Sequence, residues 1–395
     1  MATRVVAVTG IGVVTPCGTG VEDFWRGLGD EPGPRGQPLR VEGFDPAPWF
    51  GPKEVRRVDR FTQLAVAAAT LALADARLDP SGSDVDRGRA GVQVATGVGG
   101  LASYDQQLRV LEARGPSRVS PFLIPMLMPN AASAAVSIRL GWTGPCETVT
   151  TACAAGTHGV ANGAAWIRHG RCDVVLAGGS EAHPSPVGMA AFVNMTALSP
   201  SGRSRPFDAD RDGFLASEGA AMLVLEELAS ARARGAHVYA LVLGSASNAD
   251  AHHLTAPAEA GAGALACMRL ALEDAGLGPG DIAHVNAHGT STPLNDAAEA
   301  AAITALFGAP GPPVTSIKGV VGHPFGAAGA LEAAVAALTL DRGEIPPTAG
   351  YRRPDPALSL DVVAGAPRPF EPGPVLSNSF AFGGHNGCLV LGPAA

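Results

Sequence analysis

The feature that most constrains the fold is a regular alternation of short β-branched runs with alanine-rich stretches of helical length. Residues 4–9, 91–96 and 173–177 have the pattern of strands. Residues 62–78 and 154–168 have the composition and length of helices. Such alternation requires crossover connections, which predict buried sheets of mainly parallel or mixed strands. The chain is therefore expected to be an α/β protein.

The alternation occurs twice along the chain. After a strand at 221–226, the second series is expected to contain strands at 238–244, at 283–287 and around Val314, and helices at 262–275, 296–306 and 326–340. The two series look like copies of one unit, so we expect two similar α/β halves, residues 1–247 and 248–395. A chain of 395 residues is long enough for two large subdomains.

Composition and charge narrow the class of protein. A hydrophobic content of 46% with only 16% charged residues is typical of a well-buried globular chain. The net charge of −8 argues against nucleic acid as a partner, and no apolar run reaches the roughly 18 residues of a membrane span. The six cysteines form no Cys-x-x-Cys pair, and the N-terminus does not resemble a signal peptide. A cytoplasmic protein with reduced thiols is expected.

One cysteine lies where a nucleophile could be activated. The segment Thr-Thr-Ala-Cys-Ala-Ala-Gly places Cys153 between a β-rich run and the helix expected at 154–168. Backbone N–H groups at a helix start carry partial positive charge, which favours a thiolate. A thiolate at this position indicates covalent acyl chemistry. An isolated cysteine is more often a small buried hydrophobe, so Cys153 alone does not decide the matter.

Two histidine motifs favour the interpretation of Cys153 as a nucleophile. His288 lies in Val-Asn-Ala-His-Gly-Thr-Ser-Thr-Pro, and His323 lies in Gly-Val-Val-Gly-His-Pro-Phe-Gly. Each histidine follows an expected strand in a glycine-containing loop before a helix, a position that commonly faces the ligand crevice of α/β folds. Residues 377–386 are expected to form a small-residue loop whose glycine pair permits unusual backbone angles. The other eight histidines are expected to be structural.

Together these segments resemble the β-ketoacyl-acyl carrier protein synthases, the Cys-His-His condensing enzymes of the thiolase superfamily. The similarity runs from Val-Thr-Gly-Ile-Gly at residues 8–12 to Phe-Gly-Gly at 382–384. It is strongest to the elongating synthase II type and to type II polyketide ketosynthases. The resemblance implies a thiolase-like fold, with two similar α/β halves in a layered α-β-α-β-α architecture. It also implies decarboxylative Claisen condensation of a Cys-bound acyl chain with malonyl-acyl carrier protein, in fatty acid or polyketide chain elongation.

The resemblance assigns roles to individual residues. Cys153 would accept the acyl chain, and His288 and His323 would donate hydrogen bonds to the malonyl thioester oxygen. Lys318 would hold the network of the second histidine, with Glu332 in the same network. The oxyanion hole would consist of the backbone N–H groups of Cys153 and Phe382, and Phe382 would also gate malonyl entry. The residues expected to bind the phosphopantetheine arm are Thr290 and Thr292.

The resemblance also implies how substrates arrive. No intrinsic cofactor is expected, because the substrates are carried on the phosphopantetheine of acyl carrier protein. In some relatives a monovalent cation lies among residues that match Asn286, Glu332, Ser377 and Asn378; no other metal is expected. Carrier proteins are acidic, so a basic patch is expected at Lys53, Arg56, Arg57 and Arg60, with Arg203 and Arg205 as second candidates. A solvated helix face would give the same charge run.

Several alternatives stay open at this point. A dimer is expected, either a homodimer or a heterodimer with a chain-length factor, and Tyr104, Phe122, Met126 and Met128 are candidate lining residues of an acyl tunnel. The rival functions are a non-catalytic partner subunit of the chain-length-factor type and a thiolase-type acyl-CoA enzyme. The first normally lacks the nucleophile, and the second needs a reactive cysteine that Cys388 does not supply. Ala381 occupies a gate position that is usually glycine, which predicts a stiffer gate.

Overall fold

A long mixed sheet forms the centre of the protein, for which a computed structural model describes residues 4–82 and 85–394. Strand β1 (Val6–Thr15) is antiparallel to β6 (Gly219–Glu227) on one side and to β7 (Ala240–Ala249) on the other. Beyond β6 the order is β5 (Val174–Glu181), β3 (Ala90–Ala95) and the edge strand β4 (Cys146–Glu147). Beyond β7 it is β14 (His385–Gly392), β13 (Val375–Ala381), β8 (His284–Asn286), β9 (Pro313–Thr315) and β11 (Asp361–Val362).

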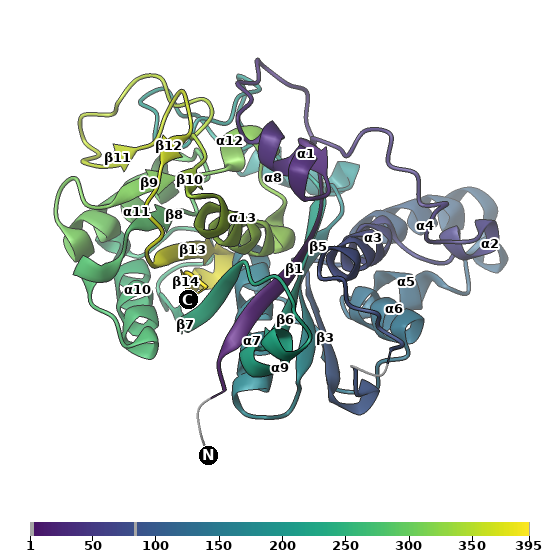
Figure 1. Cartoon of the computed structure of the whole chain (residues 1–395). Coiled ribbons are helices and arrows are strands. Elements are labelled where there is room, and N and C mark those ends of the chain that lie inside the picture. Colours follow the sequence, from purple (N-terminus) through teal and green to yellow (C-terminus); the bar gives the residue numbers. More distant parts are fainter. Residues whose placement is uncertain (1–3, 83–84, 395) are drawn as a thin grey trace.

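Helices cover both outer faces and fill the space between the two parts of the sheet. Helix α3 (Arg60–Asp75) packs on β1 and β6, and α10 (Ala262–Ala275) packs on β7 and β14, at opposite sides of the molecule (Figure 1). Helices α7 (Ala155–Arg168) and α13 (Ala328–Arg342) contact each other and strands of both parts. This arrangement gives five layers, so the expected α-β-α-β-α architecture is confirmed.

The two central helices touch because their contact residues are small. A Cβ built on Gly156 would lie 2.6 Å from the backbone nitrogen of Ala330, and one on Gly329 would lie 2.5 Å from that of Thr157. Both distances are too short for a real side chain. Helix α13 is buried from Ala328 to Leu340, and its alanine-rich sequence lets it pack on all sides.

The remaining elements surround this frame. They are the helices α1 (Val21–Gly27), α2 (Pro52–Val55), α4 (Leu101–Arg114), α5 (Leu123–Leu127), α6 (Ala131–Leu140), α8 (Pro186–Asn194), α9 (Leu228–Ala233), α11 (Pro293–Phe307) and α12 (Lys318–Val321), and the short strands β2 (Gly18–Thr19), β10 (Glu344–Ile345) and β12 (Arg368–Pro369). Among the described residues, no helix is long and apolar enough to span a bilayer.

Some elements of the structure differ from those expected from the sequence. The segment 377–386 was expected as a loop, but Ser377 to Ala381 belong to β13 and only Phe382–Gly384 forms the turn to β14. Serine and asparagine have low β-propensity, and burial between β8 and β14 overrides it here. The boundary expected at 247/248 lies inside β7, which pairs with both β1 and β14.

Candidate active site

Cys153 lies in a tight turn directly before the central helix α7. The turn is a 3₁₀ helix over Ala152–Ala154, and Ala152 has a φ of 49°. A left-handed backbone angle is uncommon for alanine, and such strained residues cluster at functional sites. The Cys153 Sγ lies 3.1 Å from His323 Nε2, so the thiol and the imidazole are in hydrogen-bond contact.

His323 follows the short helix α12 and is held by its backbone and by aromatic rings. Its N–H donates to the carbonyl of Leu215 at 2.7 Å. The ring lies edge-on to Phe214 at 5.3 Å and beside Phe325 at 5.1 Å, between ring centroids. These contacts leave the imidazole little freedom to rotate away from Cys153.

His288 stands next to His323 and is anchored by Lys318. The centroids of the two imidazoles are 5.4 Å apart, and their planes are almost perpendicular. The Lys318 Nζ lies 3.3 Å from His288 Nδ1 and donates to the His288 carbonyl at 2.6 Å. An ammonium can only donate, so Nδ1 accepts and the proton of the neutral ring sits on Nε2. Lys318 also pairs with the buried Glu332.

The structure corrects one detail of the expected network. Lys318 was expected to serve the second histidine, but its amine contacts His288 instead. Lys318 is the first residue of α12 and lies on the side of that helix next to the loop after β8, while His323 follows the other end. The structure places Cys153, His288, His323, Lys318 and Glu332 in one cluster.

Burial dominates the electrostatics of this cluster. It raises the pKa of the Cys153 thiol to about 12, with the ammonium of Lys318 acting in the opposite direction. Burial also lowers the pKa of His288 and of His323 well below the ordinary value, and Lys318 adds to both effects. The resting cluster therefore contains a thiol and two neutral imidazoles. This differs from the thiolate expected from the helix start alone.

Two buried carboxylates were missed in the sequence. Glu181, at the end of β5, accepts N–H groups of Gly97 at 2.5 Å and of Gly326 at 3.1 Å. Glu299, on α11, accepts the N–H groups of His288 and Gly289, both at 2.8 Å. Burial raises the pKa of each carboxyl to about 7. A carboxylate in the helix that directly follows the His288 motif was the signal that could have identified Glu299.

Two family models match most of the chain. The family model described as "Beta-ketoacyl synthase, N-terminal domain" matches residues 29–231, and the one described as "Beta-ketoacyl synthase, C-terminal domain" matches residues 239–352. The chain belongs to the β-ketoacyl synthase family. Cys153 lies in the first matched segment, and His288 and His323 lie in the second.

Relatives of this ketosynthase extend over its whole length. It is 41% identical to the 3-oxoacyl-[acyl-carrier-protein] synthase 2 of Synechocystis sp., over 98% of this chain and 97% of the relative. A similar protein of the same name from Rhizobium meliloti is 41% identical over 98% of each chain. The ishigamide ketosynthase/chain length factor structure has a TM-score of 0.94 at 38% identity, with both chains fully covered.

A further structural neighbour is a type II PKS ketosynthase, bound to the hexaketide, in complex with its acyl-carrier protein. It has a TM-score of 0.90 at 30% identity and covers 100% of both chains. These likenesses confirm the resemblance and the fold class inferred from the sequence.

The expected gate residue lies beside the cysteine turn of the ketosynthase. The turn Phe382–Gly384 contacts the turn Ala152–Ala154, and Phe382 is 36% exposed. The sharp reversal depends on Gly383 and Gly384, which have φ angles of 82° and 72°. Ala381 has a φ of −134°, which is extended backbone that alanine adopts without strain. In this conformation the alanine therefore causes no distortion of the turn.

Thr290 and Thr292 lie in the loop that follows His288. Their hydroxyl oxygens are 2.8 Å apart, and the Thr292 Oγ1 accepts the N–H of Asn295 as the N-cap of α11. Thr292 thus has a structural role as the cap of α11.

The four residues expected around a monovalent cation are neighbours, and two of them have free oxygens. Asn286 and Ser377 are paired in register across β8 and β13. The Asn286 Oδ1 and the Ser377 Oγ are buried and have no hydrogen-bond partner among the described residues. The Glu332 carboxylate is paired with Lys318, and the Asn378 Oδ1 accepts from the Cys388 thiol at 3.3 Å. Buried oxygens without partners are costly, so this position fits a cation.

The expected basic patch is only partly available to a partner. Lys53, Arg56 and Arg57 are exposed on α2 and just after it, and Arg57 lies over the Phe122 ring at 4.6 Å. Arg60, in contrast, donates two hydrogen bonds to the buried Glu218, at 2.6 and 2.8 Å. Its guanidinium is part of the fold, so it contributes less to any patch than its sequence position suggests.

Proposed function

We propose that this ketosynthase is an elongating β-ketoacyl-acyl carrier protein synthase of fatty acid or polyketide biosynthesis. The observation that carries the proposal is the contact of Cys153 Sγ with His323 Nε2, beside a His288 ring whose Nε2 carries the proton. The names of the relatives, 3-oxoacyl-[acyl-carrier-protein] synthase 2, support the same reaction.

Acyl loading is the first half-reaction. The Cys153 sulfur attacks the thioester carbonyl of the incoming acyl group and passes its proton to His323 Nε2. The N–H groups of Cys153 and Phe382 stabilise the tetrahedral oxyanion. The carbon–sulfur bond to the carrier arm then breaks, and the departing thiolate takes the proton from His323. Cys153 is left as an acyl thioester.

Condensation is the second half-reaction. The bond between the malonyl α-carbon and its carboxylate breaks, carbon dioxide leaves, and the electron pair forms an enolate. His288 Nε2–H, oriented by Lys318, donates to the enolate oxygen. His323 donates to the same oxygen from Nε2, in the tautomer in which the ring proton has moved from Nδ1 to Nε2. The enolate carbon attacks the Cys153 thioester, the carbon–sulfur bond breaks, and the cysteine thiolate takes a proton from solvent. Neutral imidazoles suit these steps, since each can donate one proton and accept at the other nitrogen.

Four further assignments complete the proposal. Thr290 and Thr292 hold the phosphopantetheine arm next to His288, while Lys53, Arg56 and Arg57 attract the acidic carrier protein. A monovalent cation held by Asn286 and Ser377 would neutralise the charge of the nearby buried carboxylates. The halves 1–247 and 248–395 supply the cysteine and the histidines, respectively.

The partner arrangement we propose is a dimer with a subunit of the same fold. The edge strand β4 is exposed, and the nearby α5 and α6 present Ile124 and Ile138, which are 60% and 79% exposed. Tyr104, Phe122 and Met128, expected in the acyl tunnel, are also exposed, so a second subunit is needed to enclose them. Exposed apolar groups on this scale indicate an interaction face. The six free cysteines agree with a reducing compartment, the cytoplasm.

The decisive experiment separates the two half-reactions. In Cys153→Ala, no acyl adduct should form on the protein, and condensation should stop. In His288→Ala, mass spectrometry should still detect acyl-Cys153, while release of carbon dioxide from malonyl-carrier protein should fall sharply. Normal decarboxylation in the His288 variant would refute the role given to this residue. Absence of an adduct on the unmodified protein would favour a non-catalytic partner subunit.

A further inference from the structure

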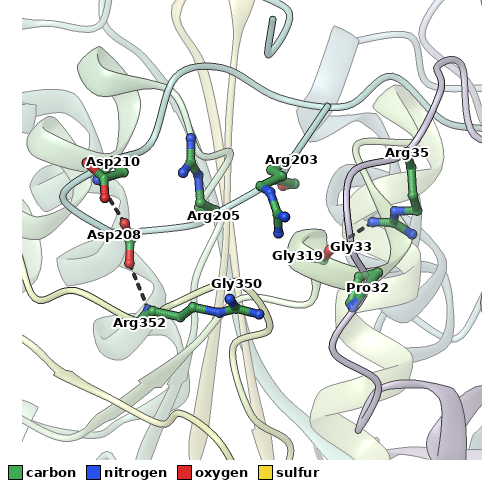
Figure 2. A pocket seen from close by; sticks show the side chains of 11 residues that line it. Pro32, Gly33, Arg35, Arg203, Arg205, Asp208, Asp210, Gly319, Gly350 and Arg352 are labelled. Atoms are coloured by element: carbon green, nitrogen blue, oxygen red, sulfur yellow. Dashed lines mark hydrogen bonds between the residues drawn. The ribbon is translucent and has the colours of Figure 1, made fainter. Parts of the chain in front are cut away.

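A polar cavity lies outside the catalytic cluster and is surrounded by arginines. Its volume is about 230 Å³, and Arg35, Arg203, Arg205 and Arg352 are among the residues that line it (Figure 2). Arg203 and Arg205 were second candidates for the basic patch, and no step of the proposed reaction takes place in this cavity.

Two of these arginines have no carboxylate partner. Arg203 makes no side-chain hydrogen bond or ion pair with any described residue. Arg35 donates only to backbone carbonyls, those of Val320 at 2.6 Å and Gly319 at 2.9 Å. Burial lowers the pKa of Arg35, and the nearby Cys17 acts in the opposite direction. The cavity therefore holds positive charge that the protein does not itself neutralise.

Several residues that line the cavity have buried polar atoms without a hydrogen-bond partner among the described residues. Ser204 lines the cavity and is 5% exposed, yet its Oγ has no hydrogen-bond partner among the described residues. The Nε atoms of Arg35 and Arg205 are likewise buried without a partner. Buried donors normally find an acceptor, so the residues around this cavity hold more donor groups than the described residues satisfy.

The acidic residues nearby do not fill this role. The Asp208 carboxylate accepts three backbone N–H groups, those of Asp210, Arg352 and Arg353, at 2.7 to 2.8 Å. Asp210 pairs with Arg353. The contacts of Arg205 with Asp212 and of Arg352 with Glu31 are longer, at 3.3 and 3.4 Å. The planar guanidinium group is well suited to phosphate, to which it can donate two parallel hydrogen bonds.

We propose that this cavity binds a phosphate group. The cavity adjoins the loop that follows His288. The backbone N–H of Arg205, a lining residue, donates to the Oγ of Ser291 at 2.8 Å, and Ser291 lies between Thr290 and Thr292 in that loop. The phosphate could be free or could belong to the phosphodiester of a carrier arm; the second source rests on the proposed function. In either case the ligand chemistry is the same.

The test is a titration with sodium phosphate at constant ionic strength, followed by ³¹P NMR. The unmodified protein should bind phosphate saturably, and Arg203→Gln should weaken binding by about tenfold, the value of one charged hydrogen bond. Arg203 has no partner to lose, so the melting temperature should not change. Arg269→Gln, which removes the same charge from the exposed face of α10, is the matched control and should bind as the unmodified protein does.

Two outcomes would overturn the proposal: no saturable binding, or equal affinity in the Arg203 and Arg269 variants. Steady-state kinetics then identify the source of the phosphate. Competition by phosphate against the carrier-bound substrate, together with a raised KM in Arg203→Gln, would assign the cavity to the carrier arm. Phosphate binding without any change in KM would assign it to a free anion. The binding measurement needs no activity, so its result does not depend on the proposed reaction.

Discussion

At the scale of single residues, Lys318 determines the geometry of the histidine cluster. One ammonium contacts the side chain and the carbonyl of His288 and the carboxylate of Glu332, and all three residues are buried. The lysine fixes the tautomer of His288, and the glutamate offsets the lysine's charge. The pair is therefore a unit, and removing one member leaves the other charge buried.

The Lys318→Met variant tests this dependence. It should lower the free energy of unfolding by about 3–5 kcal/mol, because Glu332 would remain buried without its counter-charge. The double variant Lys318→Met/Glu332→Gln should recover most of that loss. Urea unfolding measures both values, and Lys53→Met on the exposed helix α2 should change stability by no more than about 0.5 kcal/mol. Equal losses in the single and the double variant would contradict the pairing.

At the scale of elements, the contact between α7 and α13 holds Cys153 close to His323. Cys153 precedes α7 and His323 precedes α13, so the distance between the two side chains depends on how closely these helices approach. Gly156 sets that approach, because its missing side chain leaves room for the backbone of Ala330.

Gly156→Ala should separate the two helices. The added Cβ would lie 2.6 Å from the Ala330 nitrogen and 3.0 Å from the Gly326 oxygen, and overpacking of this kind costs about 1–3 kcal/mol. Acyl transfer to Cys153, followed by mass spectrometry, should slow together with the loss of stability. Gly280→Ala is the control, since nothing lies within 4 Å of its Cβ. An unchanged loading rate in Gly156→Ala would show that the helix contact does not set the catalytic distance.

The sequence predicted elements where hydrophobic periodicity and packing agree. Helix α10 has the bounds expected from the sequence, Ala262–Ala275, and α7 begins one residue later than expected. The prediction of secondary structure failed where burial in the folded protein determines the conformation. In β13 the Ser-Asn-Ser run has the composition of a loop but forms a buried strand. The polar helix Leu101–Arg114 was missed because few of its side chains are buried.

Within the site, the sequence identified the cysteine and the two histidines, but it did not identify the buried carboxylates around them. Cys153, His288 and His323 follow strands or precede helices in short motifs, and resemblance to a family grouped them. Glu181 and Glu299 support loops through backbone N–H groups that come from elsewhere in the fold. No local pattern distinguishes such a buried carboxylate from an ordinary surface one.

At the scale of the whole molecule, stability should depend on pH through a histidine outside the site. His284 on β8 is fully buried against Phe370, and neither ring nitrogen has a partner among the described residues. Burial lowers its pKa to about 3, whereas an unfolded chain has a histidine pKa of about 6.5. Below about pH 6.5 the unfolded state therefore binds a proton that the folded state does not, and stability falls with falling pH.

The His284→Leu variant isolates this effect. Above pH 7 the difference in unfolding free energy between the variant and the unmodified protein should be constant. Below about pH 6 the unmodified protein should lose about 1.4 kcal/mol more per pH unit than the variant. The raised pKa values of Glu181 and Glu299 act in the opposite direction but occur in both proteins, so they cancel. A difference that stays constant from pH 7.5 to 5 would contradict the assignment.

The cysteine and its two histidines come from different family segments, and this has a consequence for how the protein is made. Residues 29–231 leave the ribosome before residues 239–352, so the nascent chain carries Cys153 long before it carries His323. Until the later segment is synthesised and packed against α7, no imidazole is in place to take the proton from the thiol. Under the proposed mechanism, newly made chains should therefore stay unacylated until folding is complete, and the first acyl group on Cys153 would mark that point.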